Sequence, residues 1–268
     1  MGLSINSNIP ALEAGRQTRR ANGLLSRTLQ QLATARRINS AADDAAGLAI
    51  AERFNTQARQ SQVEITNLQS GVSLAQTAEG GLSVQQDALQ RLRDISIQAS
   101  NGTLSDSNRA ALNAEAQQLL QQIDTVAQDT QFNGTQVLNQ DQTISLGTEG
   151  GNQVELQSSG TTDYGVNTVD LSTAAGAQTA TAAIDQALQG VSDRRSSLGA
   201  QTNRLSSAIA QQETSAIEAQ SAESQIRDAD LARLVTERNR AQLLLQGGIG
   251  SIAQANVTSQ AALSLLGT

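Results

Sequence analysis

Few residue types in this 268-residue chain could do chemistry, because it contains no histidine and no cysteine. Zinc sites, thiol nucleophiles and Ser-His-Asp triads therefore cannot be built from it. One group of polar and apolar residues is instead spaced to share a helix face. Arg91, Ile95 and Gln98 are four and three residues apart, so they share one face of a helix, where arginine offers directional donors and isoleucine an apolar anchor. The alternative is that Ile95 faces a helical core and Arg91 is simply solvated.

A second polar group indicates where a long helix starts. Ser40 is suited to capping, and Asp43 follows three residues later in an approximate capping box. Asp43 and Asp44 would place two negative charges in the first turn, where free N–H groups favour them. We therefore expect a helix from about Ala41, although on local grounds alone it would be an ordinary capped helix.

Composition predicts extended helices rather than a core of large rings. Aromatic residues make up 1% of the chain, and the single proline is Pro10. The interior must therefore be built from Ala, Leu, Ile and Val, and long stretches run without a helix breaker. The expected fold class is mainly α, a long-helix bundle or coiled coil.

Apolar periodicity divides the first half of the chain into three helices. The first is expected to begin near Asn8, with Pro10 in its first turn. The second should run to about Ala99, with Gly80-Gly81 as the place where it would bend, and the third from Ser105 to Asp129. The apolar stripe of the first helix comprises Ile5, Ile9, Leu12, Leu25, Leu29 and Leu32.

The second half contains one small β-hairpin and the most regular helix. Polar and apolar residues alternate over 143–146 and 153–156, which predicts a hairpin near 142–157, and Phe132-Asn133-Gly134 indicates a turn. A fourth helix should start near Ser172 or Thr173. Polar residues at alternate positions exclude a simple two-stranded zipper. Its core seam recurs every seven residues, at Ile184, Val191, Leu198, Leu205, Gln212, Ala219 and Ile226.

The C-terminal segment continues as an amphipathic helix from Leu231 to Gly247-Gly248-Ile249-Gly250, after which a last short helix is expected over 252–266. Neither terminal helix has a partner nearby in sequence, so we expect the two to pair. This divides the chain into a terminal helical coiled-coil domain, residues 1–40 and 230–268, and a helix bundle with the hairpin, residues 41–229.

Charge is unevenly spread. Residues 1–40 carry six arginines against Glu13, but without the interleaved aromatic residues of a nucleic-acid site. We expect a solvated or partner-facing helix edge and no binding to nucleic acid. No run approaches the roughly 18 apolar residues of a membrane span, and residues 1–30 lack the apolar core of a signal peptide. Interleaved charges and the lack of an aromatic anchor also disfavour a membrane-surface helix at the C-terminus.

Five segments resemble bacterial flagellins, and they occur in flagellin order. The similarity covers essentially the whole chain and implies a short flagellin without the large outer domains. The segments are RINSAADDAAGLAIAERF at 37–54, LAQTAEGGL at 74–82, LQRLRDISIQASNGT at 89–103, TQFNGTQVL at 130–138 and SQIRDADLARLVTERNRAQLLLQ at 224–246.

The resemblance implies a structural subunit that self-assembles into the flagellar filament used for swimming, with no catalytic residue and no cofactor. The implied partners are other copies of the chain, the flagellar export apparatus, an export chaperone, the filament cap and the hook–filament junction proteins. The implied location is the extracellular flagellum, reached through the export channel without signal cleavage. A hook–filament junction protein stays open as the alternative. A flagellin with a metallopeptidase insert is excluded, since its zinc site needs histidine.

The resemblance also implies that a vertebrate Toll-like receptor recognises the monomer. The matching positions are Arg91, Ile95 and Gln98, with Glu115 contributed by the next helix. In the filament this face would be covered by a neighbouring subunit, so only shed monomer would be recognised.

Overall fold

The computed structural model describes residues 8–147 and 151–266, and within them it contains five α-helices and four short strands. The chain forms two compact units. Met1–Ala58 and Ile217–Thr268 make up the terminal unit, and Arg59–Ala216 makes up the bundle unit. Two of the long helices contribute residues to both units. The predicted fold class, mainly α with paired terminal helices, is confirmed.

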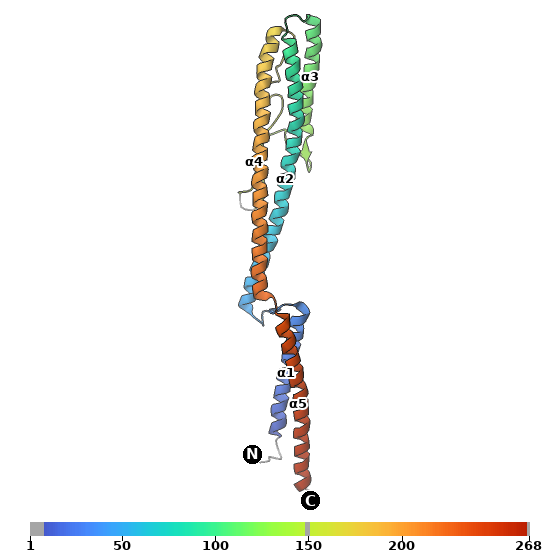
Figure 1. Cartoon of the computed structure of the whole chain (residues 1–268), viewed down its shortest axis with the longest axis vertical. Coiled ribbons are helices and arrows are strands. Elements are labelled where there is room, and N and C mark those ends of the chain that lie inside the picture. Colours follow the sequence, from blue (N-terminus) through green and yellow to red (C-terminus); the bar gives the residue numbers. More distant parts are fainter. Residues whose placement is uncertain (1–7, 148–150, 267–268) are drawn as a thin grey trace. The chain divides into compact units, whose positions relative to one another are not determined.

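The terminal unit is built on α1 (Ile9–Thr34) and α5 (Leu231–Leu266), which lie side by side in Figure 1. The helix α1 begins as predicted, because the Asn8 side chain accepts a hydrogen bond from the Ala11 backbone N–H at 3.1 Å. The predicted break of the last helix at 247–250 is wrong. The helix α5 runs through its glycines because packing against α1 outweighs their poor helix propensity.

The helix α2 (Ala45–Ala99) starts later than the sequence predicted. Its cap is Asp44, whose Oδ1 accepts a hydrogen bond from the Gly47 backbone N–H at 2.8 Å. The prediction of a start at Ala41 with Ser40 as the cap is therefore wrong. The aspartate nearest the first turn accepts from one of the free N–H groups directly, so the preceding residues are left to form a separate turn.

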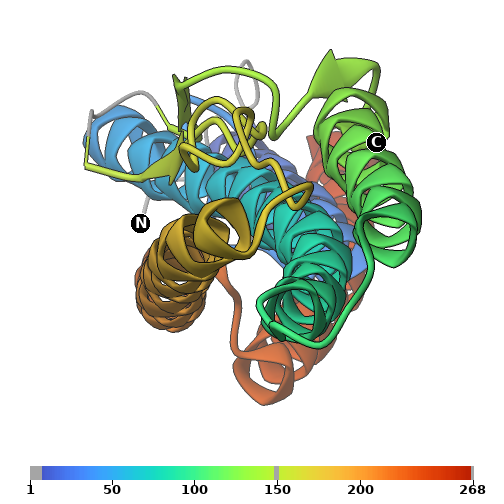
Figure 2. The same ribbon diagram turned by 90° about the horizontal axis from the view of Figure 1, so that it is seen from above.

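The bundle unit consists of α2 from Arg59 onwards, α3 (Asp106–Asp129) and α4 (Ala174–Arg227) up to Ala216. In Figure 1 and Figure 2, α2 lies between α3 and α4. The side chains that precede α3 and α4 cap them: Ser105 Oγ accepts from the Asn108 N–H and Thr173 Oγ1 from the Gly176 N–H. Both starts agree with the sequence prediction.

Two short antiparallel strand pairs accompany the helices. The pair β3 (Gln142–Ser145) and β4 (Gln153–Leu156) is the predicted hairpin. A second pair, β1 (Gln131–Phe132) and β2 (Thr135–Gln136), surrounds the predicted turn. Asn133 and Gly134 both have positive φ angles, of 49° and 79°, as two-residue hairpin turns require. The sequence therefore indicated the turn, but the strands around it were not predicted.

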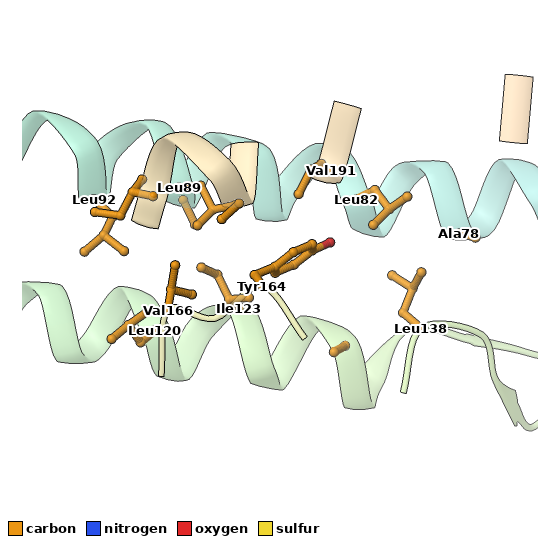
Figure 3. Close-up of a cluster of buried hydrophobic side chains, with 14 of the residues drawn as sticks. Ala78, Leu82, Leu89, Leu92, Leu120, Ile123, Leu138, Tyr164, Val166 and Val191 are labelled. Carbon is orange, nitrogen blue, oxygen red and sulfur yellow. The ribbon is translucent and has the colours of Figure 1, made fainter. Parts of the chain in front are cut away.

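The core of the bundle unit is aliphatic, with one buried tyrosine (Figure 3). Leucines of α2 face Leu120 and Ile123 of α3, and Tyr164 from the loop before α4 lies between them. Gln85 is fully buried but satisfied, since its Nε2 donates to the Ile123 and Ser159 carbonyl oxygens at 3.1 and 2.9 Å. The Tyr164 hydroxyl donates to Gln85 Oε1 at 3.2 Å, so this buried ring also has a polar partner.

Candidate assembly surface

The helices α1 and α5 form an antiparallel pair whose register can be followed along their length. Asn8 Nδ2 donates to the Ala255 carbonyl oxygen at 3.1 Å at one end of the pair. Further along, Thr18 lies against Gly248, so closely that a Cβ added at position 248 would overlap Thr18 Oγ1. Residue numbers rise on one helix as they fall on the other, which defines a single antiparallel alignment.

The seam between these helices is made mainly of small side chains. Residues that are buried or half-buried recur at alternating steps of three and four, the spacing of a coiled coil. On α1 they are Ala11, Ala14, Thr18, Ala21, Leu25, Thr28 and Leu32. On α5 they are Leu234, Arg238, Ala241, Leu245, Gly248, Ile252 and Ala255.

Most of the large apolar side chains of the pair point away from this seam. Leu12 is 60% exposed and Leu243 69% exposed. The predicted pairing is therefore correct, but only part of the predicted stripe is its contact surface. Leu25 and Leu32 are half-buried in the seam, whereas Ile9, Leu12 and Leu29 are exposed and Ile5 lies outside the described residues. Small residues take most of the other seam positions on α1 because they allow closer helix approach. The remaining exposed large apolar residues of the two helices are Ile9, Leu24, Leu29, Leu231, Val235, Leu244, Ile249 and Val257.

Exposed apolar residues are concentrated in the terminal unit. Of the large apolar side chains exposed in the described part of the chain, all but Val63, Val84 and Ile97 belong to it. Residues 241–266 of α5 also contain no charged side chain. Because burying a charge is costly, an uncharged surface with outward leucines is suited to being covered by another protein. We refer to these outward residues of α1 and α5 as the assembly surface.

The segment that joins α1 to α2 is held by its own acidic turn. Asp43 Oδ2 accepts hydrogen bonds from the Asn39 and Ser40 backbone N–H groups at 3.2 and 3.1 Å, and Arg27 lies 3.1 Å from Oδ1. The Asn39 N–H, followed by the Ser40 groups and Arg27, lowers the pKa of Asp43 from its ordinary value, against a smaller effect of burial. The turn therefore favours an ionised Asp43.

A pair of arginines connects this segment to the end of α4. The Arg37 N–H donates to the Arg227 carbonyl oxygen at 2.7 Å, and the Ala229 N–H donates to the Ala35 carbonyl oxygen at 3.0 Å. The Arg227 side chain, 13% exposed, also lies 3.1 Å from Glu52 and 3.5 Å from Glu223. Sequence reasoning placed Arg227 only within a flagellin-like segment, since no local pattern reveals a contact across 190 residues of chain.

The predicted receptor-binding group is only partly assembled at the surface. Arg91 and Glu115 are both exposed and form an ion pair, with Arg91 Nη2 and Nε at 2.7 and 3.0 Å from Glu115 Oε1. Gln98 is exposed as well. Ile95, however, is 1% exposed and belongs to the core of the bundle unit. Its predicted role as an apolar surface anchor is therefore wrong, because its side chain is buried in this core and not available to a partner.

The seven-residue seam of α4 is buried over most of its length. Ile184, Val191, Leu198 and Leu205 are buried in the core of the bundle unit, whereas Ile226 in the terminal unit is half-buried. No group of histidine, cysteine or acidic side chains suited to a metal ion occurs within residues 8–147 and 151–266. Over the same residues, no helix has the length and apolarity needed to cross a bilayer.

Comparison with known proteins identifies the family. Residues 5–143 match the model of the bacterial flagellin N-terminal helical region, and residues 181–266 match that of the C-terminal helical region. A flagellin of Halalkalibacterium halodurans is 39% identical over 98% of this chain and 100% of its own length. Flagellin FlaB2 of Treponema pallidum is 33% identical over the same shares of the two chains.

Among solved structures, the flagellin of Bacillus cereus is 31% identical, covers 55% of this chain and 88% of its own, and has a TM-score of 0.49. The relatives above match over nearly the whole chain and are flagellins, which favours the filament subunit over the predicted alternative, a hook–filament junction protein. The two family models and the full-length relatives show that this chain belongs to the bacterial flagellins, a structural and non-enzymatic family, and is a subunit of the flagellar filament.

Proposed function

We propose that the assembly surface on α1 and α5 is the contact through which copies of this chain polymerise. The observation that supports this is the concentration of outward apolar side chains on a helix pair whose own seam uses small residues. A surface of this kind is stable in water only when another protein covers it. In a filament the cover is the same surface region of neighbouring copies, arranged head to tail so that the contact never closes.

In this proposal the predicted domains have separate places in the filament. Residues 1–40 and 230–268 form an inner tube, and residues 41–229 form the outer layer. The division follows the apolar residues, because the assembly surface lies on α1 and α5 while the bundle unit buries most of its large aliphatic side chains.

The test compares a leucine and a valine whose side chains are equally exposed. Leu12 on α1 and Val63 on α2 are both 60% exposed, but only Leu12 belongs to the assembly surface. Leu12→Ser should raise the concentration needed for polymerisation, measured by sedimentation and electron microscopy, by about tenfold or more. Val63→Ser serves as the matched control and should polymerise as the unchanged chain does. Equal behaviour of the two variants would contradict the proposal.

We further propose the export route implied by the flagellin resemblance. The subunit would pass through the flagellar export apparatus without signal cleavage, with an export chaperone beforehand and the filament cap at the growing end. Membership of the flagellin family supports this route. Expression in flagellated cells with and without a working export apparatus tests it, by the amount of full-length chain in the culture medium. Secretion in both strains would contradict it.

Recognition of the monomer by a host Toll-like receptor is a separate proposal. Its support is the exposed Arg91–Glu115 ion pair beside exposed Gln98, a directional polar surface without the buried Ile95. Arg91→Ala should weaken receptor binding by about 2 kcal/mol or more. Arg93→Ala is the control, because Arg93 is on the same helix but pairs with Asp185 of α4. Unchanged binding of folded Arg91→Ala monomer would refute the proposal.

A further inference from the structure

The chain contains the tripeptide Asn-Gly-Thr twice, at 101–103 and at 133–135. In an Asn-Gly sequence the glycine backbone nitrogen can attack the asparagine side chain, because glycine offers little steric hindrance. The two copies have the same residues at all three positions, so the sequence predicts equal reactivity. Their conformations differ, and the structure therefore distinguishes them.

At the first copy the asparagine side chain is already polarised. Asn101 Oδ1 accepts hydrogen bonds from both the backbone N–H and the hydroxyl of Thr103, each at 3.0 Å. These donors point at the oxygen on which negative charge would develop during attack at the side-chain carbon, as donors of an oxyanion hole do. They also restrict the rotation of the Asn101 side chain, whose amide carbon must meet the Gly102 nitrogen.

The attacking nitrogen at this site is not engaged elsewhere. Within the described residues, Gly102 N–H donates no hydrogen bond, although the N–H groups of Asn101 and Leu104 donate to Gln98 and Asn101 carbonyl oxygens. Asn101 and Gly102 are both exposed, so water can reach the site. No neighbouring atom would obstruct the backbone at Gly102, since the space beside its Cα is open.

The second copy lacks the polarised side chain, although within the described residues Gly134 N–H also donates no hydrogen bond and both Asn133 and Gly134 are exposed. Asn133 and Gly134 form the tight turn between β1 and β2, and both are held at positive φ by the strand pairing on either side. No hydrogen bond to Asn133 Oδ1 occurs within residues 8–147 and 151–266. A third Asn-Gly sequence, Asn22-Gly23, lies inside α1, where the helix holds the glycine nitrogen in its own hydrogen-bonding pattern.

We propose that Asn101 is a site of self-modification, at which the folded chain promotes its own deamidation. The Gly102 nitrogen forms a bond to Asn101 Cγ and gives up its proton to water. The bond from Cγ to Nδ2 then breaks, and the nitrogen leaves as ammonia after gaining a proton. Water opens the resulting cyclic imide at one of its two carbonyls and yields aspartate or isoaspartate. Either product adds a negative charge between α2 and α3, and isoaspartate also lengthens the main chain.

The test follows the two Asn-Gly-Thr sites in the same purified full-length protein. After incubation in mildly alkaline buffer, trypsin releases residues 94–109 with Asn101, and cleavage after glutamate releases residues 116–149 with Asn133. Fragment mass spectra then locate each conversion of amide to acid. In the folded protein Asn101 should react at least about tenfold faster than Asn133. In denaturant the two rates should become equal, because the difference arises from folding.

Thr103 provides the decisive variants. Thr103→Val removes one of the two donors and should slow the reaction at Asn101 by about threefold or more, while Asn133 is unaffected. Thr103→Ser keeps the hydroxyl and should retain the rate. Thr135→Val, the matched change at the second copy, should alter neither rate. Equal rates at both sites in the folded protein, or a Thr103→Val variant that reacts as fast as the unchanged chain, would overturn the proposal.

Discussion

Arg37 and Arg227 each bond the backbone beside the other. Arg37 Nη2 donates to the Ile226 carbonyl oxygen at 2.6 Å, and Arg227 Nε donates to the Ile38 carbonyl oxygen at 3.4 Å, around a direct backbone hydrogen bond between the two residues. The end of α4 and the segment between α1 and α2 are thereby held together. Carbonyl groups that the helix end leaves without partners are satisfied at the same time.

Arg227→Gln should destabilise the terminal unit by about 2 kcal/mol. The substitution removes a poorly exposed cation and leaves Glu223, also largely buried, without its counter-charge. The free energy of unfolding can be measured by denaturant titration. Arg233→Gln is the control, because Arg233 pairs with Glu237 on the same helix with a 76% exposed side chain and should contribute less than about 1 kcal/mol. Equal losses would show that burial of Arg227 is unimportant.

Gly248→Ala should weaken the α1–α5 pair, although alanine favours helices. The added Cβ would overlap Thr18 Oγ1, which itself donates to the Ala14 carbonyl oxygen at 2.8 Å, and the expected cost is about 1–3 kcal/mol. At Gly250 no neighbouring atom lies within 4 Å of the added Cβ. Gly250→Ala should therefore raise the stability by roughly 1 kcal/mol. The thermal midpoint of each variant checks this.

The loss expected for Gly248→Ala can also be rescued. Thr18→Ala removes the overlapping oxygen, so the double variant Thr18→Ala with Gly248→Ala should recover most of the loss. A Gly248→Ala variant that is as stable as Gly250→Ala would show that the helices are not in close contact at this position.

Leu205→Ala should lower the free energy of unfolding of the bundle unit by about 2–5 kcal/mol, because Leu205 is fully buried and the change leaves a cavity. Leu198, which is also buried, should behave in the same way. Ile217→Ala is the control, since Ile217 on the same helix is well exposed and should cost no more than about 0.5 kcal/mol. An unchanged thermal midpoint for both leucine variants would place the seam in solvent.

The turn before α2 should weaken in acid. The pKa of Asp43 is lowered from its ordinary 3.8, chiefly by the Asn39 backbone N–H. Because the pKa of Asp43 is lower in the folded chain than in the unfolded chain, its ionised carboxylate stabilises the fold at any pH above the unfolded pKa. This stabilisation is lost as the pH falls from 3.8 through the pKa of the folded chain. A pH titration of the Asp43 carboxyl group followed by NMR should report the lowered pKa. Asp43→Asn should remove this part of the acid dependence, and a variant with the same acid dependence as the unchanged chain would contradict the account.

The sequence alone determined the features that depend on neighbours along the chain. The helices α1 and α3 begin near Asn8 and Ser105 as predicted, because the cap that starts each helix is a contact across three residues. The alternation around 142–157 correctly predicted a hairpin. The seven-residue recurrence correctly predicted one long helix, expected from Ser172 or Thr173 and observed from Ala174. The flagellin-like segments likewise determined the family, since they occur along the chain in a fixed order.

Only the tertiary structure decided which apolar face meets which partner. Leu12 and Ile95 have similar hydrophobicity, yet Leu12 is exposed and Ile95 is in the core, because the partner helix takes the face on which small residues or matching cavities allow the closest packing. The glycines of α5 were predicted to end a helix. The helix instead continues through them, and one of them, Gly248, contacts Thr18 of α1. Arg227 bonds residues about 190 positions away, and a periodic pattern contains no information about such a contact.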